Sequence, residues 1–140
     1  MKRLLFLLGA VTLGAAQAAT VEQVTDLNAV LGLMRGNVQL VGDRFGSVPF
    51  QRGILNLAQS GAIRVQVLTT KANAANMKPL KAVGARVNTF GGKFTGSLIL
   101  VENKAVIFPV GNAWRVMRGP QEAAQMAAVL APYWQVSKPY

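Results

Sequence analysis

The spacing of apolar residues predicts a helix in the segment that follows residue 20. Six apolar residues recur there at steps of three and four: Val21, Val24, Leu27, Val30, Leu31 and Met34. Steps of this size place side chains on one face of a helix. Gly36 follows, and glycine commonly occupies the position just after a helix. We therefore expect an amphipathic helix that begins near residue 21 and ends at Gly36.

Short apolar stretches predict the strands. Residues 37–41 have the composition of a buried strand. Residues 63–68 alternate apolar side chains with Arg64 and Gln66, so this strand has one face in the core and one face nearer water. The other expected strands are 85–89, the two arms of a hairpin at 98–101 and 105–108, and 114–117.

Capping residues, prolines and glycines predict the helices between these strands. Ser47 can cap a helix that accommodates Pro49 in its first turn and ends at Gly61. Thr70 can cap the next helical segment, which Pro79 restarts and which ends at Gly84.

A final Ala-rich helix is expected from Gly119-Pro120 through Ala131. Met126, Val129 and Leu130 are expected to face inward, with Tyr133 and Trp134 packing at the end of the helix. The elements alternate strand and helix before the hairpin. Strand-helix-strand units imply parallel pairing, and a hairpin adds antiparallel strands. We therefore expect an α/β fold with a mixed, mostly parallel sheet flanked by helices.

The first eighteen residues have the pattern of a cleaved secretory signal peptide. Lys2 and Arg3 give a positive start, an apolar run follows, and Ala16-Gln17-Ala18 is a small-x-small cleavage site. The apolar run is shorter than the roughly 20 residues that span a bilayer. We expect cleavage after Ala18, one domain over 19–140, no stable membrane insertion after cleavage, and a secreted or periplasmic protein.

Composition excludes many kinds of chemistry. The 140 residues contain no Cys and no His, which excludes disulfides, thiolate nucleophiles, imidazole bases and Cys or His metal sites. We expect no cofactor and no metal. The formal net charge is +10, and removal of residues 1–18 takes away two basic residues, leaving thirteen against five acidic, or +8. Such a charge suits a nucleic acid or another polyanion as partner, although it can also serve solubility alone.

Two stretches carry a resemblance to a known family. They are ILNLAQSGAIRVQVLT at 54–69 and MKPLKAVGARV at 77–87. They resemble the phospholipase D superfamily, in which a helix and strand of this kind are followed by a second helix and by the strand that leads to the catalytic loop. The resemblance runs from about residue 37 to residue 134 and implies a phospholipase D-like half-domain.

The family motif, His-x-Lys-x(4)-Asp, is degenerate in this chain. Aligned on the apolar strand at 98–101, Thr95 takes the His position, Ser97 the Lys position and Glu102 the Asp position. In the family the His is the nucleophile, and covalent catalysis needs a nucleophile that a neighbouring base can activate. The family's phosphodiesterase mechanism therefore cannot operate here, and no catalytic residue is assigned.

An anion-binding pocket could survive the loss of catalysis. The resemblance would place four residues around the former phosphate site: Lys93, Thr95, Ser97 and Asn112. One cation and several neutral donors suit an oxyanion. The alternative is that Thr95 and Ser97 only fill strand positions and that Lys93 is a solvated loop residue.

The resemblance also implies assembly, because active members pair two motif copies across a two-fold axis. We therefore expect a homodimer, or pairing with another phospholipase D-like half. The function expected is that of a secreted, noncatalytic domain that binds an anionic ligand or a protein partner. Three alternatives stay open: a phosphodiesterase-type hydrolase of unfamiliar mechanism, a basic module for nucleic acid or another anionic polymer, and a structural envelope protein without a ligand.

Overall fold

The computed structural model describes residues 3–4 and 21–140. The expected signal peptide and its cleavage site therefore lie outside the described residues, apart from Arg3 and Leu4. These two form a short strand, β1 (Arg3–Leu4), that pairs in parallel with β6 (Lys93–Phe94). None of the helices in the described part of the chain has the length and apolar composition that a bilayer span requires.

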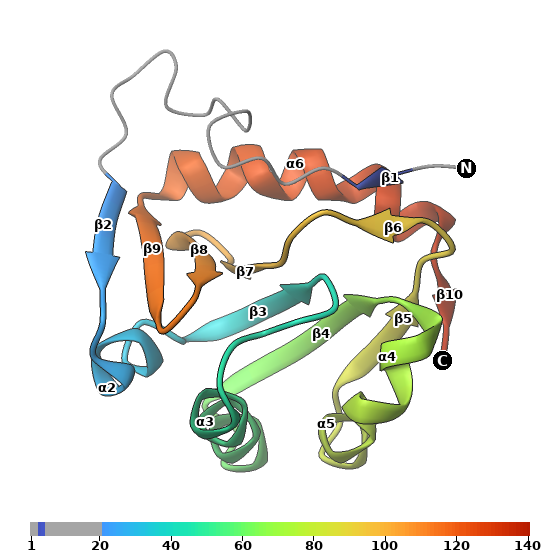
Figure 1. The fold of residues 1–140 in the computed structure, drawn as a ribbon, viewed down its shortest axis with the longest axis horizontal. Coiled ribbons are helices and arrows are strands. Elements are labelled where there is room, and N and C mark those ends of the chain that lie inside the picture. Colours follow the sequence, from blue (N-terminus) through green and yellow to red (C-terminus); the bar gives the residue numbers. More distant parts are fainter. Residues whose placement is uncertain (1–2, 5–20) are drawn as a thin grey trace.

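Eight strands of the described chain form one sheet, in the order β10-β5-β4-β3-β7-β8-β9-β2 (Figure 1). Their bounds are β2 (Val21–Val24), β3 (Gly36–Val41), β4 (Ile63–Thr69), β5 (Arg86–Thr89), β7 (Leu98–Val101), β8 (Ala105–Val110), β9 (Ala113–Arg118) and β10 (Lys138–Pro139). The prediction of a mixed sheet flanked by helices is confirmed. Its description as mostly parallel is wrong, since only the pairs β3–β4 and β4–β5 are parallel and the other five are antiparallel.

The connections explain why antiparallel pairs prevail. After β5 the chain returns to the far side of β3 and enters the sheet there as β7, antiparallel to β3. The links β7–β8 and β8–β9 are tight turns, and short links allow only antiparallel neighbours. Parallel pairing is therefore confined to the strands joined through helices.

Helices cover the two faces of the sheet separately (Figure 1). Their bounds are α2 (Leu27–Leu31), α3 (Val48–Gln59), α4 (Lys71–Ala74), the 3₁₀ turn η1 (Ala75–Met77), α5 (Lys78–Ala82) and α6 (Pro120–Val136). One buried cluster joins residues of α2, α3 and α5 to Val38, Leu40, Val65 and Val67 of the sheet. A second cluster joins Met126 and Leu130 of α6 to the opposite face, including Val41 and Leu68. The sheet thus has an α3–α5 face and an α6 face.

The predicted caps and helix breaks are confirmed. Ser47 Oγ accepts a hydrogen bond from Phe50 N at 3.3 Å, and Thr70 Oγ1 accepts one from Asn73 N at 3.2 Å. Pro79 lies in the first turn of α5, as its missing N–H and fixed φ allow. The strands at 37–41, 63–68 and 85–89, the hairpin and the strand at 114–117 are also present, with bounds shifted by one or two residues.

The first predicted helix is largely wrong. Residues 21–24 form β2, which pairs with β9 in the register Val21 with Met117 and Val24 with Trp114. Helix α2 begins only after Asp26, whose carboxylate caps it by accepting from Asn28 N at 3.3 Å. Val21 and Val24 are compatible with either conformation, and pairing with a distant strand decides between them.

The last helix also differs from its prediction. Helix α6 continues past Ala131 to Val136, with Pro132 inside it. Met126 and Leu130 are fully buried as expected, but Val129 is 46% exposed, so its inward assignment is wrong. Tyr133 and Trp134 are half-buried against the α6 core.

Candidate functional site

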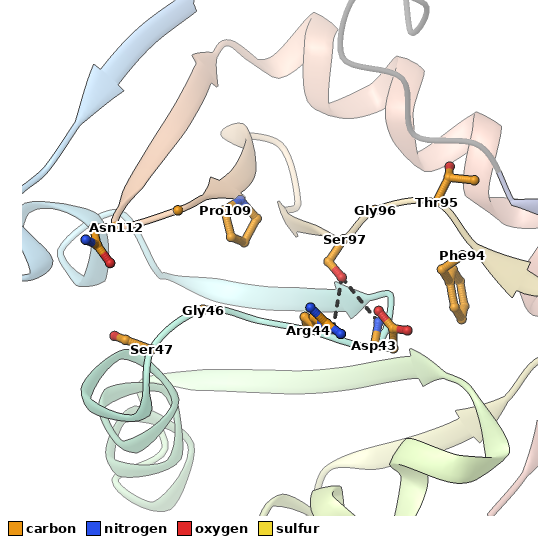
Figure 2. Close-up of a pocket in the computed structure, with 11 residues that line it drawn as sticks. Asp43, Arg44, Gly46, Ser47, Phe94, Thr95, Gly96, Ser97, Pro109 and Asn112 are labelled. Carbon is orange, nitrogen blue, oxygen red and sulfur yellow. Dashed lines mark hydrogen bonds between the residues drawn. The ribbon is translucent and has the colours of Figure 1, made fainter.

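An open cleft of about 700 Å³ lies where β3 ends and β7 begins. Its walls come from the loop after β3, the start of α3, the segment between β6 and β7, and the turn between β8 and β9 (Figure 2). Eleven residues line it: Asp43, Arg44, Gly46, Ser47, Phe94, Thr95, Gly96, Ser97, Pro109, Gly111 and Asn112. Clefts at the carboxyl ends of parallel strands are the usual ligand sites of open α/β sheets.

Ser97 fixes the loop that forms one wall of the cleft. Its Oγ accepts hydrogen bonds from Asp43 N at 3.2 Å and from Arg44 N at 3.1 Å, and Figure 2 shows its side chain directed at these two residues. The contact follows from the register, because Val41 pairs with Leu98 and the next residues outward are Gly42 and Ser97. The hydroxyl can still donate its own proton into the cleft.

The structure brings together three of the four predicted anion-binding residues. Thr95, Ser97 and Asn112 line the cleft, but Lys93 does not. Lys93 is exposed on β6. In the view of Figure 2 the Thr95 side chain points away from Ser97, so these two hydroxyls do not converge on one point.

Glu102, which the sequence alignment assigned to the motif's Asp position, is not among the residues that line the cleft. It follows β7 whereas Ser97 precedes it, and five residues of extended chain separate them by roughly 16 Å. Its Oε2 accepts a hydrogen bond from Gln39 Nε2 at 3.1 Å. Glu102 therefore belongs to a partly buried polar contact at the other end of the strand.

Sequence reasoning missed Asp43, Arg44 and Ser47 as cleft residues. They are 48 to 52 residues from Thr95 in the chain, so no local motif joins them. The available signal was the turn-rich segment 42–47 between the end of a parallel strand and a capped helix. Arg44 supplies the cation that Lys93 was expected to supply, and Asp43 supplies an opposite charge, so the lining has no net formal charge.

The cleft combines hydrogen-bond donors with one guanidinium and one carboxylate. Arg44, the Asn112 amide and the Ser97 hydroxyl can donate to an oxyanion. Helix α3, of 12 residues, starts at the same wall, and its N-terminus carries a partial positive charge. Within residues 3–4 and 21–140 no group of three or more His, Cys, Asp or Glu residues could hold a metal ion.

Comparison with known proteins relates the chain through structure alone. No protein-family model and no curated protein matches the sequence. Nuc from Salmonella typhimurium, a phospholipase D family member, aligns with a TM-score of 0.66 and 13% identity over 86% of this chain and 97% of Nuc. NucT from Helicobacter pylori aligns with a TM-score of 0.60 and 12% identity over 86% of this chain and 100% of NucT.

A third similar structure is that of TrmBL2, an archaeal chromatin protein whose structure shows a novel mode of DNA binding. It aligns with a TM-score of 0.61 and 15% identity, over 91% of this chain and 57% of TrmBL2. Identities this low establish the fold. The alignments with Nuc and NucT show that the chain has a phospholipase D-like fold.

Proposed function

We propose that this chain is a noncatalytic phospholipase D-like domain that binds an anionic ligand in the cleft between β3 and β7. The observation that carries the proposal is the gathering of Arg44, Ser97 and Asn112 around one open cleft at the carboxyl end of β3. A guanidinium offers several N–H donors in a fixed plane, and a hydroxyl and an amide complete the coordination of an oxyanion.

The absence of catalysis is argued from the side chains available. The sequence has no His, so no phosphohistidine can form and no imidazole can protonate a leaving group. The Ser97 oxygen already accepts two backbone N–H groups, which draw on the electron pairs that a nucleophile needs.

The position of Asp43 favours the alternative that the protein is a hydrolase. Its carboxylate lines the cleft that also contains Thr95, and a carboxylate can act as a general base. A test is hydrolysis of bis(p-nitrophenyl) phosphate by the purified protein and by Thr95→Ala and Asp43→Asn. Hydrolysis that both substitutions abolish would favour this alternative over the noncatalytic proposal.

Compartment and assembly complete the proposal. Residues 1–18 act as a cleaved signal peptide, so that the domain works in the periplasm or outside the cell. The domain pairs with a second copy or with another phospholipase D-like half, as the family resemblance implies. A monomer in multi-angle light scattering of the purified protein would contradict self-pairing.

The ligand test is titration of the purified protein against inorganic phosphate and against labelled single-stranded and duplex oligonucleotides. The reported DNA binding of TrmBL2 supports the choice of oligonucleotides. Arg44→Ala should weaken binding by about ten- to a hundredfold, since a hydrogen bond to a charged group contributes about 1.5 to 3 kcal/mol. Arg52→Ala removes the same charge from the exposed side of α3, outside the cleft lining, and is the matched control.

Each outcome of this titration distinguishes a different case. A loss confined to Arg44→Ala supports binding in the cleft. Equal losses for Arg44→Ala and Arg52→Ala mean that the net charge alone attracts the ligand. No binding of phosphate or of either oligonucleotide contradicts the proposal and directs the search to a protein partner.

A further inference from the structure

The α6 face of the sheet carries a polar surface on strands that would ordinarily be apolar. Strands β3 and β4 have neighbours on both sides, and Val38, Leu40, Val65 and Val67 are buried on their α3–α5 face. On the α6 face the same strands present Asn37, Gln39, Arg64 and Gln66, and β5 adds Arg86. Internal strands that pair in parallel are usually apolar on both faces, so this pattern requires an explanation.

The register places these polar residues next to one another. Asn37 pairs with Arg64, Gln39 pairs with Gln66, and Gln66 pairs with Arg86. Paired residues of neighbouring parallel strands point to the same face, and Arg64 is two residues before Gln66 on that face. Arg64 and Arg86 are therefore diagonal neighbours on one side of the sheet.

Helix α6 does not cover this part of the sheet. It packs chiefly on β7, β8 and β9. Its last turn reaches β3, where Trp134 Nε1 donates to Gln39 Oε1 at 2.8 Å. Beyond this contact Asn37, Arg64 and Arg86 are exposed to solvent.

A groove of about 530 Å³ lies at the amino ends of β4 and β5, and residues from both faces of the sheet line it. It is bounded by the ends of α3 and α5, and its lining is Asn37, Ala58, Gly61, Ile63, Arg64, Val65, Gln66, Val83, Gly84, Ala85 and Arg86. Among these residues the only charged side chains are the two arginines. Within residues 21–140 neither arginine forms an ion pair. The nearby Glu102 carboxylate is hydrogen-bonded to Gln39 and does not line the groove.

Trp134 restricts the position of one of the two arginines. The guanidinium carbon of Arg86 lies 5.5 Å from the centre of the Trp134 ring. A cation–π contact of this kind restrains the guanidinium and lowers the entropy lost when its N–H groups bind a ligand. The side-chain amides of Asn37 and Gln66 add neutral donors at the same groove.

We propose that Arg64 and Arg86, with the amides of Asn37 and Gln66, form a second anion-binding site that takes a phosphate group. Two guanidiniums without a carboxylate in the groove match the charge and the planar hydrogen-bonding geometry of a phosphate. The site lies at the amino end of β4, whereas the cleft lies at the carboxyl ends of the parallel strands. The seven residues of β4 separate them by roughly 20 Å. One phosphate cannot occupy both positions, so the second site is independent of the cleft.

The phosphate could be a free anion or part of a phosphodiester strand, and two titrations distinguish these sources. The purified ¹⁵N-labelled protein is titrated with inorganic phosphate and, separately, with a short oligodeoxythymidylate. Shifts of the backbone amides of Arg64, Gln66 and Arg86 in either titration support the site. If inorganic phosphate shifts these amide resonances, the free anion is sufficient for binding. If only the oligonucleotide shifts them, the ligand is a phosphodiester strand.

The variants test whether the two arginines carry this binding. Arg64→Ala/Arg86→Ala should abolish the shifts at Gln66. With the oligonucleotide it should reduce the slope of log affinity against log salt by about 1.4, because each neutralised phosphate of a single strand contributes about 0.7. Lys71→Ala/Lys78→Ala removes the same charge from exposed positions outside the groove and should leave the Gln66 shifts in place.

One outcome would overturn the site without touching the proposed function. The arginines follow the ends of α3 and α5, where a cation also stabilises the helix dipole. Suppose that Arg64→Ala/Arg86→Ala lowers the midpoint of chemical denaturation, and that the amide resonances of the groove shift in neither titration. The arginines then stabilise the helix ends and the site does not exist. Binding in the cleft, and the effect of Arg44→Ala on it, is followed at the backbone amides of residues 43–47 and 112. The two sites are therefore measured separately.

Discussion

Gly42 and Ser97 are in such close contact that Gly42 has no room for a side chain. A Cβ atom on Gly42 would lie 2.2 Å from Ser97 Oγ and 2.7 Å from Ser97 Cα. Gly42 also has φ +130°, a backbone conformation that residues with a Cβ rarely adopt. Its N–H donates to Leu68 O at 2.9 Å, so the peptide is held from the β4 side as well. The wall of the cleft therefore depends on a glycine that faces the Ser97 hydroxyl.

Gly42→Ala should destabilise the protein strongly. The new methyl group would push on Ser97 backbone as well as on its side chain, and the positive φ would add backbone strain. We expect the free energy of unfolding to fall by about 2 to 4 kcal/mol in chemical denaturation. Gly91→Ala is the matched control, because a Cβ there meets nothing within 4 Å and its φ is not in the strained range. Similar losses for both variants would contradict the steric argument.

Ser97→Ala tests the hydrogen bonds of the same contact. Removal of the hydroxyl leaves Asp43 N and Arg44 N without their acceptor in the protein, so that water must take its place. We expect a loss of about 1 kcal/mol and faster hydrogen exchange at these two amides. Ser60→Ala, which removes an exposed hydroxyl that donates to Leu57 O, should leave the exchange at Asp43 and Arg44 unchanged. Unchanged exchange in Ser97→Ala would show that the loop does not depend on Ser97.

The sequence predicts the elements that are fixed by neighbours along the chain. Ser47 and Thr70 cap their helices through bonds to residues three positions later, and the hairpin at 98–108 is defined by its own turn. Such contacts appear in any window of a few residues. This is why most helices and strands of the described chain fall within one or two residues of their predicted bounds.

Contacts between distant segments account for the failures. Residues 21–24 become a strand because β9, some ninety residues later, offers an edge to pair with. The cleft combines Asp43 and Arg44 with Ser97, and their juxtaposition follows from the pairing of β3 with β7. The spacing of apolar residues does not specify which strands pair, so neither the sheet direction nor the full cleft could be derived from it.

Helix α6 offers a test of which side faces the sheet. Leu130 is fully buried and Val129, its neighbour in the chain, is 46% exposed. Leu130→Ala should lower the free energy of unfolding by about 2 to 5 kcal/mol, because it removes buried methyl groups and leaves a cavity. Val129→Ala should change it by less than about 0.5 kcal/mol. The reverse order of the two losses would mean that the helix is rotated on the sheet.

The polar contact beneath the end of α6 gives the last prediction. Gln39, 9% exposed, accepts from Trp134 Nε1 at 2.8 Å and donates to Glu102 Oε2 at 3.1 Å. Gln39→Leu has a similar shape but removes both hydrogen bonds, so it should cost about 1 to 3 kcal/mol of stability. It should also shift the indole N–H resonance of Trp134.

Gln66→Leu is the control for this change. Gln66 pairs with Gln39 in the neighbouring strand and shares its face of the sheet, so the same substitution is made in nearly the same surroundings. Without a hydrogen bond to Trp134 to lose, it should leave the indole resonance in place and change stability by less than about 0.5 kcal/mol. Equal effects of the two substitutions would show that stability and the indole resonance depend on the polarity of this face and not on the hydrogen bond to Trp134. The unequal effects that we expect would instead make Gln39 the residue that anchors the end of α6 over the sheet.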